Sequence, residues 1–363
     1  MRILQLITRS EIGGAQSVAR GLCEGLSARG HELILASGPE GGGQAWQGLP
    51  DSIALASLPH LVRRLAPARD LLALAEISGL YARLKPDIIH LHTSKAAALG
   101  RLAPGRGRAA LVYTMHGYDQ LRVSNRKFLA IDRALSGAGA KLVAVSAQDR
   151  AAMKADGYPE PIVIPNGVLS PASGRDDEAA RSMRRLREKG LPIVLCLARD
   201  APPKRPDLFI QAASILRGKA SFAWAGNTGH YGSSDVSWLG AVEGAASLWP
   251  LADIACLASD HEGLPMSVLE AMAAGLPTVA SAVGGIPEAL SGTCGRAVEN
   301  DAGAFAAALL AYIEDEGQRK AAGAMAKARW AGMYSASAMA DAYESLYETL
   351  LARRSTKYGK GSA

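Results

Sequence analysis

Short apolar segments alternate along this chain with longer helix-like segments, and this alternation restricts the possible fold more than any other feature. One set of apolar segments lies within residues 3–165 and a second within residues 193–281. The segments between them are rich in Ala, Leu and Arg at helical spacing, as in residues 15–29 and 70–84. Strands that alternate with helices are typical of a parallel sheet covered by helices on both faces. We therefore predict an α/β fold with two such sheets.

A polar stretch separates the two sets of strands. Residues 170–178 combine Ser, Pro and Gly with charged residues, and a charged helix-like segment follows. We place the domain boundary there, which gives an N-terminal domain over 1–170 and a C-terminal domain over 171–335. Apolar residues at helical offsets predict an amphipathic helix over 336–352. The basic residues 353–363 are expected to form a disordered tail.

The composition indicates a globular protein that attracts anions. Of the 363 residues, 48% are apolar and 20% are charged, which excludes a disordered chain. Lys and Arg number 40 against 34 Asp and Glu, and the net charge of +6 attracts nucleotides, phosphates, nucleic acids and acidic lipids. Only 5% of the residues are aromatic, and no recognition motif accompanies the positive charge. We therefore expect no nucleic-acid partner.

The cysteines and the apolar segments suggest a reducing compartment. The cysteines are scattered without metal-ligand spacing, and we interpret them as buried thiols: Cys23, Cys196, Cys256 and Cys294. The first apolar run is short and ends in charged residues, unlike a secretory signal. No apolar stretch reaches the roughly 20 residues that span a bilayer. We expect a cytoplasmic protein, or one peripheral on the inner face of the cytoplasmic membrane.

Two glutamates near the start of one predicted helix carry the most informative chemistry. Residues 259–281 indicate a strand end, a loop, a helix and a second strand, with Gly-Leu-Pro on each side of the helix. Glu262 lies in the loop and Glu270 within the helix. Carboxylates there accept hydrogen bonds from a polyol, while the amides around Gly263 and Leu264 attract an anion. A sugar nucleotide presents both groups, whereas an arbitrary glutamate pair would be solvated or would cap the helix.

This stretch resembles the E-x7-E signature of the retaining GT4 glycosyltransferases, and the similarity continues through residues 271–280 and 284–288. Other segments resemble landmarks of the same family in the expected order: Gly13-Gly14-Ala15, residues 87–95, 114–117, 145–146, 164–168, and Arg199 to Lys204. The resemblance extends over residues 1 to 350. It implies the GT-B fold, in which two Rossmann-like parallel-sheet domains face an interdomain cleft and the C-terminal helix crosses back to the N-terminal domain.

Cations and glycines in these segments suit a sugar diphosphate. Arg199 and Lys204 follow a predicted strand, and open α/β sheets bind ligands at the carboxyl ends of their strands. Cations there neutralise the charge that grows on a leaving diphosphate, although isolated Arg and Lys side chains are usually solvated. Gly13 and Gly14 permit close approach of the backbone to the donor, or form only a strand-to-helix turn. Because G-x-G-x-x-G is absent, a dinucleotide cofactor is not expected.

Histidines at strand ends are further candidates. His116 ends a predicted strand, where a neutral imidazole acting as a hydrogen-bond donor would hold a sugar hydroxyl, and the resemblance implies contact with the donor sugar. The alternative is a satisfied core histidine. We expect His90 and His92 to point to opposite faces of their strand, which argues against a shared metal site and leaves them structural roles. The candidates on the acceptor side are Thr93, Ser94 and Lys95.

The resemblance implies retention of configuration at the anomeric carbon. Retaining glycosidases use a carboxylate nucleophile about 5 Å from the acid, and no such nucleophile is evident here. We expect front-face substitution, in which the leaving phosphate oxygen takes the proton of the acceptor hydroxyl. By family analogy Glu270 holds the ribose diol and Glu262 the donor sugar. The expected catalytic residues are His116, Arg199, Lys204 and Glu262.

The sequence has no Asp-x-Asp and no cluster with metal-ligand spacing. We therefore expect transfer without a metal or another cofactor. Two departures from the family affect the donor pocket. Residues 227–235 lead almost directly into the strand at 236–239, so a helix is expected to be missing on the base-binding side. Pro202 and Pro203 stiffen the loop before Lys204.

The favoured function is hexosyl transfer from a UDP-sugar to a hydroxyl of a glycan or lipid-linked acceptor, in the assembly of a bacterial surface polysaccharide or glycolipid. Residues 92–102 resemble a pattern of bacterial relatives that assemble such polymers. Residues 60–72 combine apolar and basic side chains, and either contact anionic lipid headgroups or form a solvated helix face. Two alternatives stay open: a GT-B sugar-nucleotide epimerase, which needs no acceptor, and a catalytically silent GT-B scaffold protein.

Overall fold

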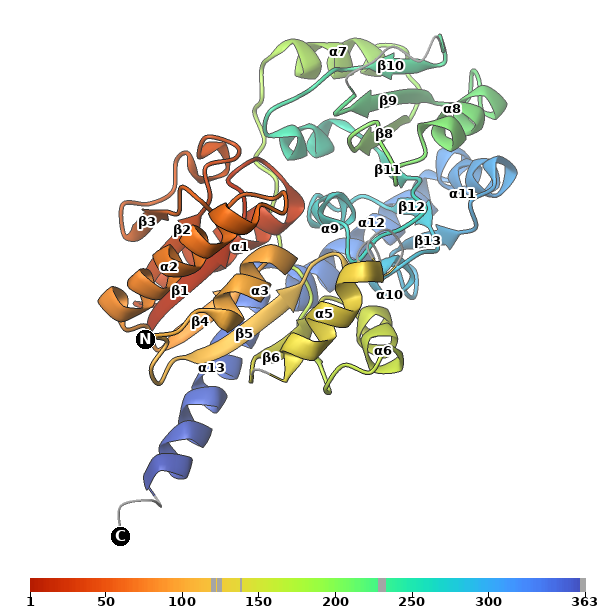
Figure 1. Ribbon diagram of the computed structural model, residues 1–363. Coiled ribbons are helices and arrows are strands. Elements are labelled where there is room, and N and C mark those ends of the chain that lie inside the picture. Colours follow the sequence, from red (N-terminus) through yellow and green to blue (C-terminus); the bar gives the residue numbers. More distant parts are fainter. Residues whose placement is uncertain (119–121, 123–125, 138, 228–232, 360–363) are drawn as a thin grey trace. The chain divides into compact units, whose positions relative to one another are not determined.

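The computed structural model describes residues 1–118, 122, 126–137, 139–227 and 233–359 (Figure 1). The chain forms two compact units. The N-terminal unit comprises Met1–Gly167 and Ala336–Ala363, and the C-terminal unit comprises Val168–Ser335. Each unit has its own sheet, which confirms the prediction of an α/β fold with two parallel sheets.

The N-terminal unit is built on a seven-stranded sheet with the order β3-β2-β1-β4-β5-β6-β7. Its strands are β1 (Arg2–Ile7), β2 (Glu32–Ser37), β3 (Ile53–Ser57), β4 (Ile88–Leu91), β5 (Ala110–Met115), β6 (Lys141–Ala144) and β7 (Ile162–Val163). All neighbouring strands pair in parallel. The strand order changes direction between β1 and β4, and open α/β sheets bind ligands at that position, beyond the carboxyl ends of the strands.

Helices connect these strands and cover the sheet (Figure 1). They are α1 (Gly14–Ser27), α2 (Pro67–Leu84), α3 (Ser94–Leu102), α5 (Arg126–Ser136) and α6 (Ala147–Ala155), with the 3₁₀ turn η1 (Gln44–Trp46). The apolar strands β1, β4 and β5 are almost entirely buried, since helices lie on both faces of a parallel sheet.

The C-terminal unit contains a six-stranded sheet with the order β10-β9-β8-β11-β12-β13. The strands are β8 (Ile193–Leu197), β9 (Ser221–Ala225), β10 (Val236–Trp238), β11 (Ile254–Leu257), β12 (Thr278–Ser281) and β13 (Gly295–Val298). Strands β8 and β11 are parallel neighbours. The order changes direction between them, so the loops that follow β8 and β11 leave the same edge of the sheet side by side.

The helices of this unit are α7 (Glu178–Arg187), α8 (Pro206–Ile215), η2 (Ala245–Leu251), α9 (Met266–Ala273), α10 (Ile286–Ala289), α11 (Ala302–Glu314), α12 (Glu316–Arg329) and η3 (Trp330–Tyr334). Gly275 follows α9 in the left-handed conformation (φ 78°), which glycine adopts without steric cost. The helix therefore stops where the sequence predicted, and the chain turns into β12.

The connection between β9 and β10 is short for two parallel neighbours, which usually need a crossover of a dozen or more residues. The described residues between them, 226–227 and 233–235, contain no helix. Residues 228–232 of the predicted shortened segment lie outside the described residues. Asn227, just after β9, accepts a hydrogen bond from the main-chain N–H of Gly240 (2.9 Å), just after β10, so this bond joins the chain beyond the carboxyl ends of the two strands.

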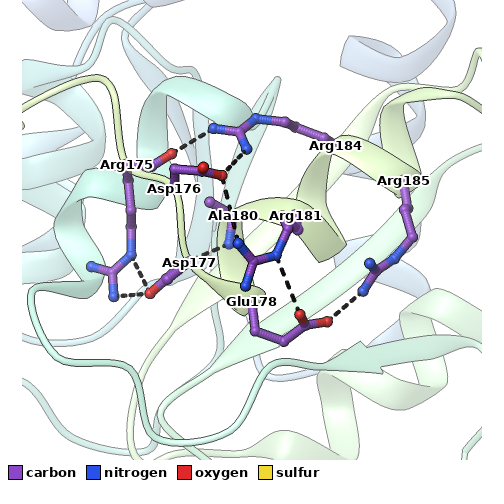
Figure 2. Close-up of polar contacts among 8 residues, drawn as sticks. All are labelled: Arg175, Asp176, Asp177, Glu178, Ala180, Arg181, Arg184 and Arg185. Carbon is purple, nitrogen blue, oxygen red and sulfur yellow. Dashed lines mark hydrogen bonds and ion pairs between the residues drawn. The ribbon is translucent and has the colours of Figure 1, made fainter.

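Charged residues lead into α7 (Figure 2). Asp177 caps the helix by accepting a hydrogen bond from the N–H of Ala180 (2.9 Å), and its bond with Arg175 lowers the pKa of Asp177 to about 2. Arg175 also donates to the carbonyl of Glu243 (2.6 Å). The other arginines pair with Asp176 and Glu178: Arg181, Arg184 and Arg185. The polar stretch between the sets of strands is thus fastened to the C-terminal unit.

The last helix, α13 (Ala336–Gly359), belongs to the N-terminal unit. It packs against α1 and buries Tyr343 and Tyr347 beneath the sheet. An ion pair between Arg29, in the turn after α1, and Asp341 of α13 joins the two helices. This packing gives the apolar face of the predicted amphipathic helix its partner within the same unit.

The helix continues to Gly359, so the prediction of a disordered tail from residue 353 is wrong for residues 353–359. The side chain of Arg354 donates hydrogen bonds to the main-chain carbonyls of Arg108 and Ala109. These bonds fix the end of the helix to the loop before β5, an interaction that basic composition alone does not indicate.

All four cysteines are buried and free, as predicted. Within the described residues, no helix combines the length and the apolar character that crossing a membrane requires.

Candidate active site

The predicted pair of glutamates lies at the carboxyl edge of the C-terminal sheet. Glu262 is in the loop after β11, and Glu270 is in α9. The helix begins directly after Pro265, whose ring removes a main-chain donor that the first turn would leave unpaired. The order of loop, helix and following strand agrees with the prediction for residues 259–281.

Lys204 forms an ion pair with Glu262. The two side chains are only 17% and 12% exposed, so the pair is largely removed from water. Main-chain hydrogen bonds hold the loops together: Arg205 N donates to Ala258 O (3.0 Å), and Asp260 N donates to Pro203 O (2.8 Å). The loops that follow β8 and β11 therefore act as one structure that carries a cation and a carboxylate.

Gly284 presses against the backbone of the glutamate loop. A Cβ atom at Gly284 would lie 1.7 Å from the carbonyl oxygen of Glu262, and its φ of 55° is in the left-handed region. Gly285 N also donates to Gly263 O (2.6 Å). Gly284 thus sets the position of Glu262. We had not predicted it as a site residue, although the Gly-Gly pair before Ile286 was the available signal.

Glu270 is half-buried, and desolvation raises the pKa of its carboxyl group above the usual value. The indole of Trp249, on η2, opposes that shift. Among the described residues, Glu270 forms no ion pair, in contrast to Glu262. A partly desolvated carboxylate without a cation is a strong acceptor for hydroxyl groups, because water competes less for it.

Arg199 lies directly beyond β8 and is exposed. The backbone before it is closely packed: a Cβ atom at Gly226 would lie 2.5 Å from Ala198 O, and the indole N–H of Trp224 donates to the same oxygen (2.8 Å). These contacts therefore fix the backbone position from which the side chain of Arg199 extends. Within the described residues, no hydrogen bond joins its guanidinium to Lys204 or Glu262.

In the N-terminal unit, Gly13 and Gly14 form the start of α1, as the turn after β1 predicted. Gly13 is the N-cap residue in an extended conformation, and a Cβ atom there would lie 2.8 Å from Oε1 of Gln16. No side chain caps the first turn at this position. The first turn of α1 therefore has no side-chain hydrogen bond from its N-cap residue.

The residues predicted for the acceptor side have different surroundings. The hydroxyl of Thr93 hydrogen-bonds to that of Thr8 (2.6 Å), and accepts from Thr8 N (3.1 Å). Lys95 pairs with Asp70 of α2 (2.6 Å) and donates to Arg64 O. Ser94 is exposed. Lys95 therefore holds α2 in place, and the hydroxyl of Ser94 forms a hydrogen bond with Tyr113.

His116 follows β5 and contacts a second histidine. Its Nε2 atom lies 3.0 Å from Nδ1 of His92, and the two rings are stacked at an interplanar angle of 10°. Burial lowers the pKa of His116 to about 4, while Asn166 beside the ring opposes this shift. His116 is therefore neutral at pH 7, as the role of a neutral hydrogen-bonding group requires.

The prediction that His90 and His92 point to opposite faces is wrong. Side chains two residues apart in a strand lie on the same face, and the ring centroids are 4.1 Å apart. Both rings are hydrogen-bonded within the unit: His90 to Tyr347 and Thr114 (2.7 Å each), and His92 to Gln5. In the described part of the chain, no three His, Cys, Asp or Glu residues are grouped so that they could hold a metal ion.

The chain matches two family descriptions. Glycosyltransferase Family 4 matches residues 12–169, and Glycosyl transferases group 1 matches residues 191–315. The chain belongs to the GT4-type glycosyltransferases. This agrees with the resemblance found in the sequence, and the two matches correspond to the two units of the structure.

Individual proteins resemble this GT4-type glycosyltransferase over most of its length. It is 27% identical to the Escherichia coli UDP-Gal:alpha-D-GlcNAc-diphosphoundecaprenol alpha-1,3-galactosyltransferase, over 65% of this chain and 68% of that one. It is 29% identical to D-inositol 3-phosphate glycosyltransferase of Geodermatophilus obscurus, over 66% and 63%. The chain thus spans about two thirds of those relatives.

Among solved structures, Anabaena HepE in complex with UDP-glucose superimposes with a TM-score of 0.81. The match covers 96% of this chain and all of HepE, at 19% sequence identity. The likeness shows that the fold is GT-B, with two Rossmann-like domains, as predicted from the resemblance.

Proposed function

We propose that this chain is a retaining glycosyltransferase that moves a hexose from a UDP-sugar to a hydroxyl of a glycan or lipid-linked acceptor without a metal ion. The observation that carries the proposal is the Lys204–Glu262 pair beside α9, with the desolvated carboxylate of Glu270 in that helix. Cation, carboxylates and helix N-terminus together match the charges and hydroxyls of a nucleoside diphosphate sugar.

The C-terminal unit holds the nucleotide part of the donor. The carboxylate of Glu270 accepts hydrogen bonds from the ribose hydroxyls, and the start of α9 near Gly263 and Leu264 attracts the diphosphate. Arg199 extends toward the diphosphate from the end of β8. Glu262 orients Lys204 until the diphosphate arrives, and then binds a hydroxyl of the donor sugar.

Transfer proceeds on one face of the donor sugar. The acceptor oxygen bonds to the anomeric carbon as the bond from that carbon to the phosphate oxygen breaks, and the proton of the acceptor hydroxyl passes to that phosphate oxygen. Arg199 and Lys204 stabilise the negative charge that develops on the UDP group, which replaces the usual role of a divalent ion. His116 holds a hydroxyl of the donor sugar near the reacting carbon.

A similar protein supports the choice of donor and stereochemistry. The Escherichia coli relative is named for UDP-Gal as donor and for an alpha-1,3 linkage. An α linkage is the product of retention, because the sugar of UDP-Gal is α-linked to its diphosphate. The name also states a diphosphoundecaprenol-linked acceptor. We infer that this chain takes a lipid-linked glycan acceptor, in bacterial surface polysaccharide or glycolipid assembly.

A lipid-linked acceptor requires access to a membrane surface. Leu65, Leu71 and Leu72 are exposed at and before the start of α2, beside the exposed Arg63 and Arg69. Apolar and basic side chains together favour an anionic lipid surface, and we propose peripheral binding to the inner face of the cytoplasmic membrane. Sedimentation with phosphatidylglycerol vesicles should capture the protein, and Leu71→Ser should reduce capture; equal sedimentation with neutral phosphatidylcholine vesicles would contradict this electrostatic contribution.

The donor is tested by thermal unfolding in EDTA with UDP-glucose, UDP-galactose and UDP-N-acetylglucosamine. A ligand at 100 times its Kd adds about 2.7 kcal/mol to the stability of the folded state, so one of the three should raise Tm. Glu270→Ala should abolish the shift, and the control Glu299→Ala, which removes an exposed carboxylate of the same unit, should retain it. No shift with any donor favours a silent scaffold, and conversion of the UDP-sugar without acceptor favours an epimerase.

A further inference from the structure

Three polar residues close a ring of hydrogen bonds at the carboxyl edge of the C-terminal sheet. Ser259 follows β11, Ser281 ends β12 and Asn300 follows β13, and these strands are consecutive neighbours in the sheet. Ser259 N donates to Ser281 Oγ (2.8 Å), and Ser281 Oγ donates to Asn300 Oδ1 (2.5 Å). Nδ2 of Asn300 donates back to Ser259 O (3.0 Å). Together these residues form the Ser259 ring.

The direction of each bond in the Ser259 ring follows from its chemistry. The main-chain N–H of Ser259 only donates, so the hydroxyl oxygen of Ser281 accepts there and its one proton goes to Asn300. The amide of Asn300 therefore presents its oxygen to Ser281 and its NH₂ group to the carbonyl of Ser259. Both serines are fully buried, so removal of Ser281 would leave a buried main-chain donor without a partner, which costs more than a lost surface hydrogen bond.

The hydroxyl of Ser259 connects the two loops that carry the ion pair of the candidate site. It lies 3.2 Å from the carbonyl oxygen of Pro203 and 3.2 Å from that of His261, and donates its single proton to both. Pro203 immediately precedes Lys204, and His261 immediately precedes Glu262. One buried side chain thus holds the backbone from which both members of the pair extend.

Asn300 joins the same loops by a second route. Its Nδ2 atom also donates to Oδ1 of Asp260 (3.2 Å), which accepts from the guanidinium of Arg205 (3.1 Å). Asp260 follows Ser259 in the chain, and Arg205 follows Lys204. These charged contacts are exposed, so water and salt weaken them, and the buried hydroxyl of Ser259 is the stronger connection.

We propose that Ser259 is a positioning residue for Lys204 and Glu262, and that Ser281 and Asn300 hold Ser259 in place. The proposal rests on the proposed function, in which Lys204 stabilises the leaving diphosphate and Glu262 binds the donor sugar. The Ser259 ring acts through the two loops and does not itself bind the donor. A misplacement of about 1 Å in a reacting group lowers a rate by about 100-fold, so such a ring affects transfer without contact with the substrate.

Glu270, the proposed partner of the ribose, lies outside this arrangement. It belongs to α9, and within the described residues no hydrogen bond joins it to the Ser259 ring. A change in the ring should therefore affect the reacting groups more than nucleotide binding. This separates a positioning role from a role in stability alone, which would leave kcat of the folded protein unchanged.

The first test needs no substrate. A double-mutant cycle with Lys204→Ala and Glu262→Ala gives their coupling free energy by urea unfolding of the full-length protein, and the cycle is repeated in each ring variant. Ser259→Ala should reduce the coupling to about half or less, and Asn300→Ala, which changes an exposed side chain, should reduce it as well. Glu299→Ala is the matched control, because this exposed neighbour forms no side-chain hydrogen bond or ion pair within the described residues, and it should leave the coupling unchanged.

An unchanged coupling in a folded Ser259→Ala protein overturns the proposal. Should Ser259→Ala not fold, an unchanged coupling in Asn300→Ala overturns it, and so does an equal reduction in Glu299→Ala. Because the measurement uses no donor, it decides the proposal even where donor turnover fails.

The second test is release of UDP from the UDP-sugar that raises Tm. Ser259→Ala and Asn300→Ala should lower kcat, by about 10- to 100-fold in Ser259→Ala, and the Kd for UDP should change much less. Glu299→Ala should keep both values. An unchanged kcat in a folded Ser259→Ala protein, or a loss of UDP affinity as large as the loss of kcat, overturns the proposal. Absence of turnover in the wild-type protein instead contradicts the proposed function.

Discussion

Nζ of Lys204 contacts Oε1 of Glu262, and this contact joins the loops that follow β8 and β11 at one edge of the C-terminal sheet. The pair is mostly buried, so its charges interact more strongly than those of a surface pair. The pair also holds the ammonium group of Lys204 at the position where the diphosphate of a donor is proposed to bind. Stability and donor binding therefore depend on the same two side chains.

A double-mutant cycle on Lys204 and Glu262 measures how much their contact contributes to the stability of the protein. Lys204→Ala and Glu262→Ala should each destabilise the protein, and the coupling free energy between them should be about 1–3 kcal/mol, since residues in direct contact are not additive. Urea unfolding of the four proteins gives the value. A coupling free energy near zero would mean that the contact between Lys204 and Glu262 does not stabilise the protein in solution.

Gly284→Ala should destabilise the C-terminal unit because its methyl group collides with the carbonyl of Glu262. Gly292→Ala is the matched control: its φ is 78°, also left-handed, but no atom lies within 4 Å of an added Cβ. The control should lose about 1–2 kcal/mol from the backbone conformation alone, and Gly284→Ala about 2–5 kcal/mol. Equal losses in urea unfolding would argue against the close contact.

Glu270 should make stability depend on pH. Burial raises its native pKa above the unfolded value of about 4.3. Between these two pKa values the native state binds more protons, so the free energy of unfolding falls as pH rises, and the loss persists above the native pKa. Glu270→Gln should remove this fall and be more stable than wild type at pH 7, while losing donor affinity. The exposed control Glu299→Gln should leave the pH profile unchanged, and a wild-type profile in Glu270→Gln would contradict the burial of a charged group.

Local sequence signals predicted the two sheets and the positions of the two glutamates. Alternating strands and helices predicted both sheets, and the Gly-Leu-Pro boundaries placed Glu262 before α9 and Glu270 within it, because these signals are local. The pairing of Lys204 with Glu262 was not predicted. It depends on the adjacency of β8 and β11, which are far apart in the chain.

Three other features were not predicted correctly. One pattern was misinterpreted, and the other two features depend on contacts between residues that are distant in the chain. His90 and His92 share a face because strands repeat every two residues, which the sequence interpretation applied incorrectly. The end of α13 was missed because its attachment comes from a contact of Arg354 with the distant loop at residues 108–109. Gly284 was quoted as part of a motif, but only the folded chain shows that its missing side chain makes room for the carbonyl of Glu262.

The most direct test is a crystal structure of the protein with the UDP-sugar that raises Tm, grown in EDTA. The ribose hydroxyls should lie at hydrogen-bonding distance from the carboxylate of Glu270, about 2.5–3.0 Å, with the diphosphate beside Lys204 and Arg199 and no metal between them. A donor bound elsewhere, or a metal ion bridging its diphosphate to the protein, would contradict the proposed donor site.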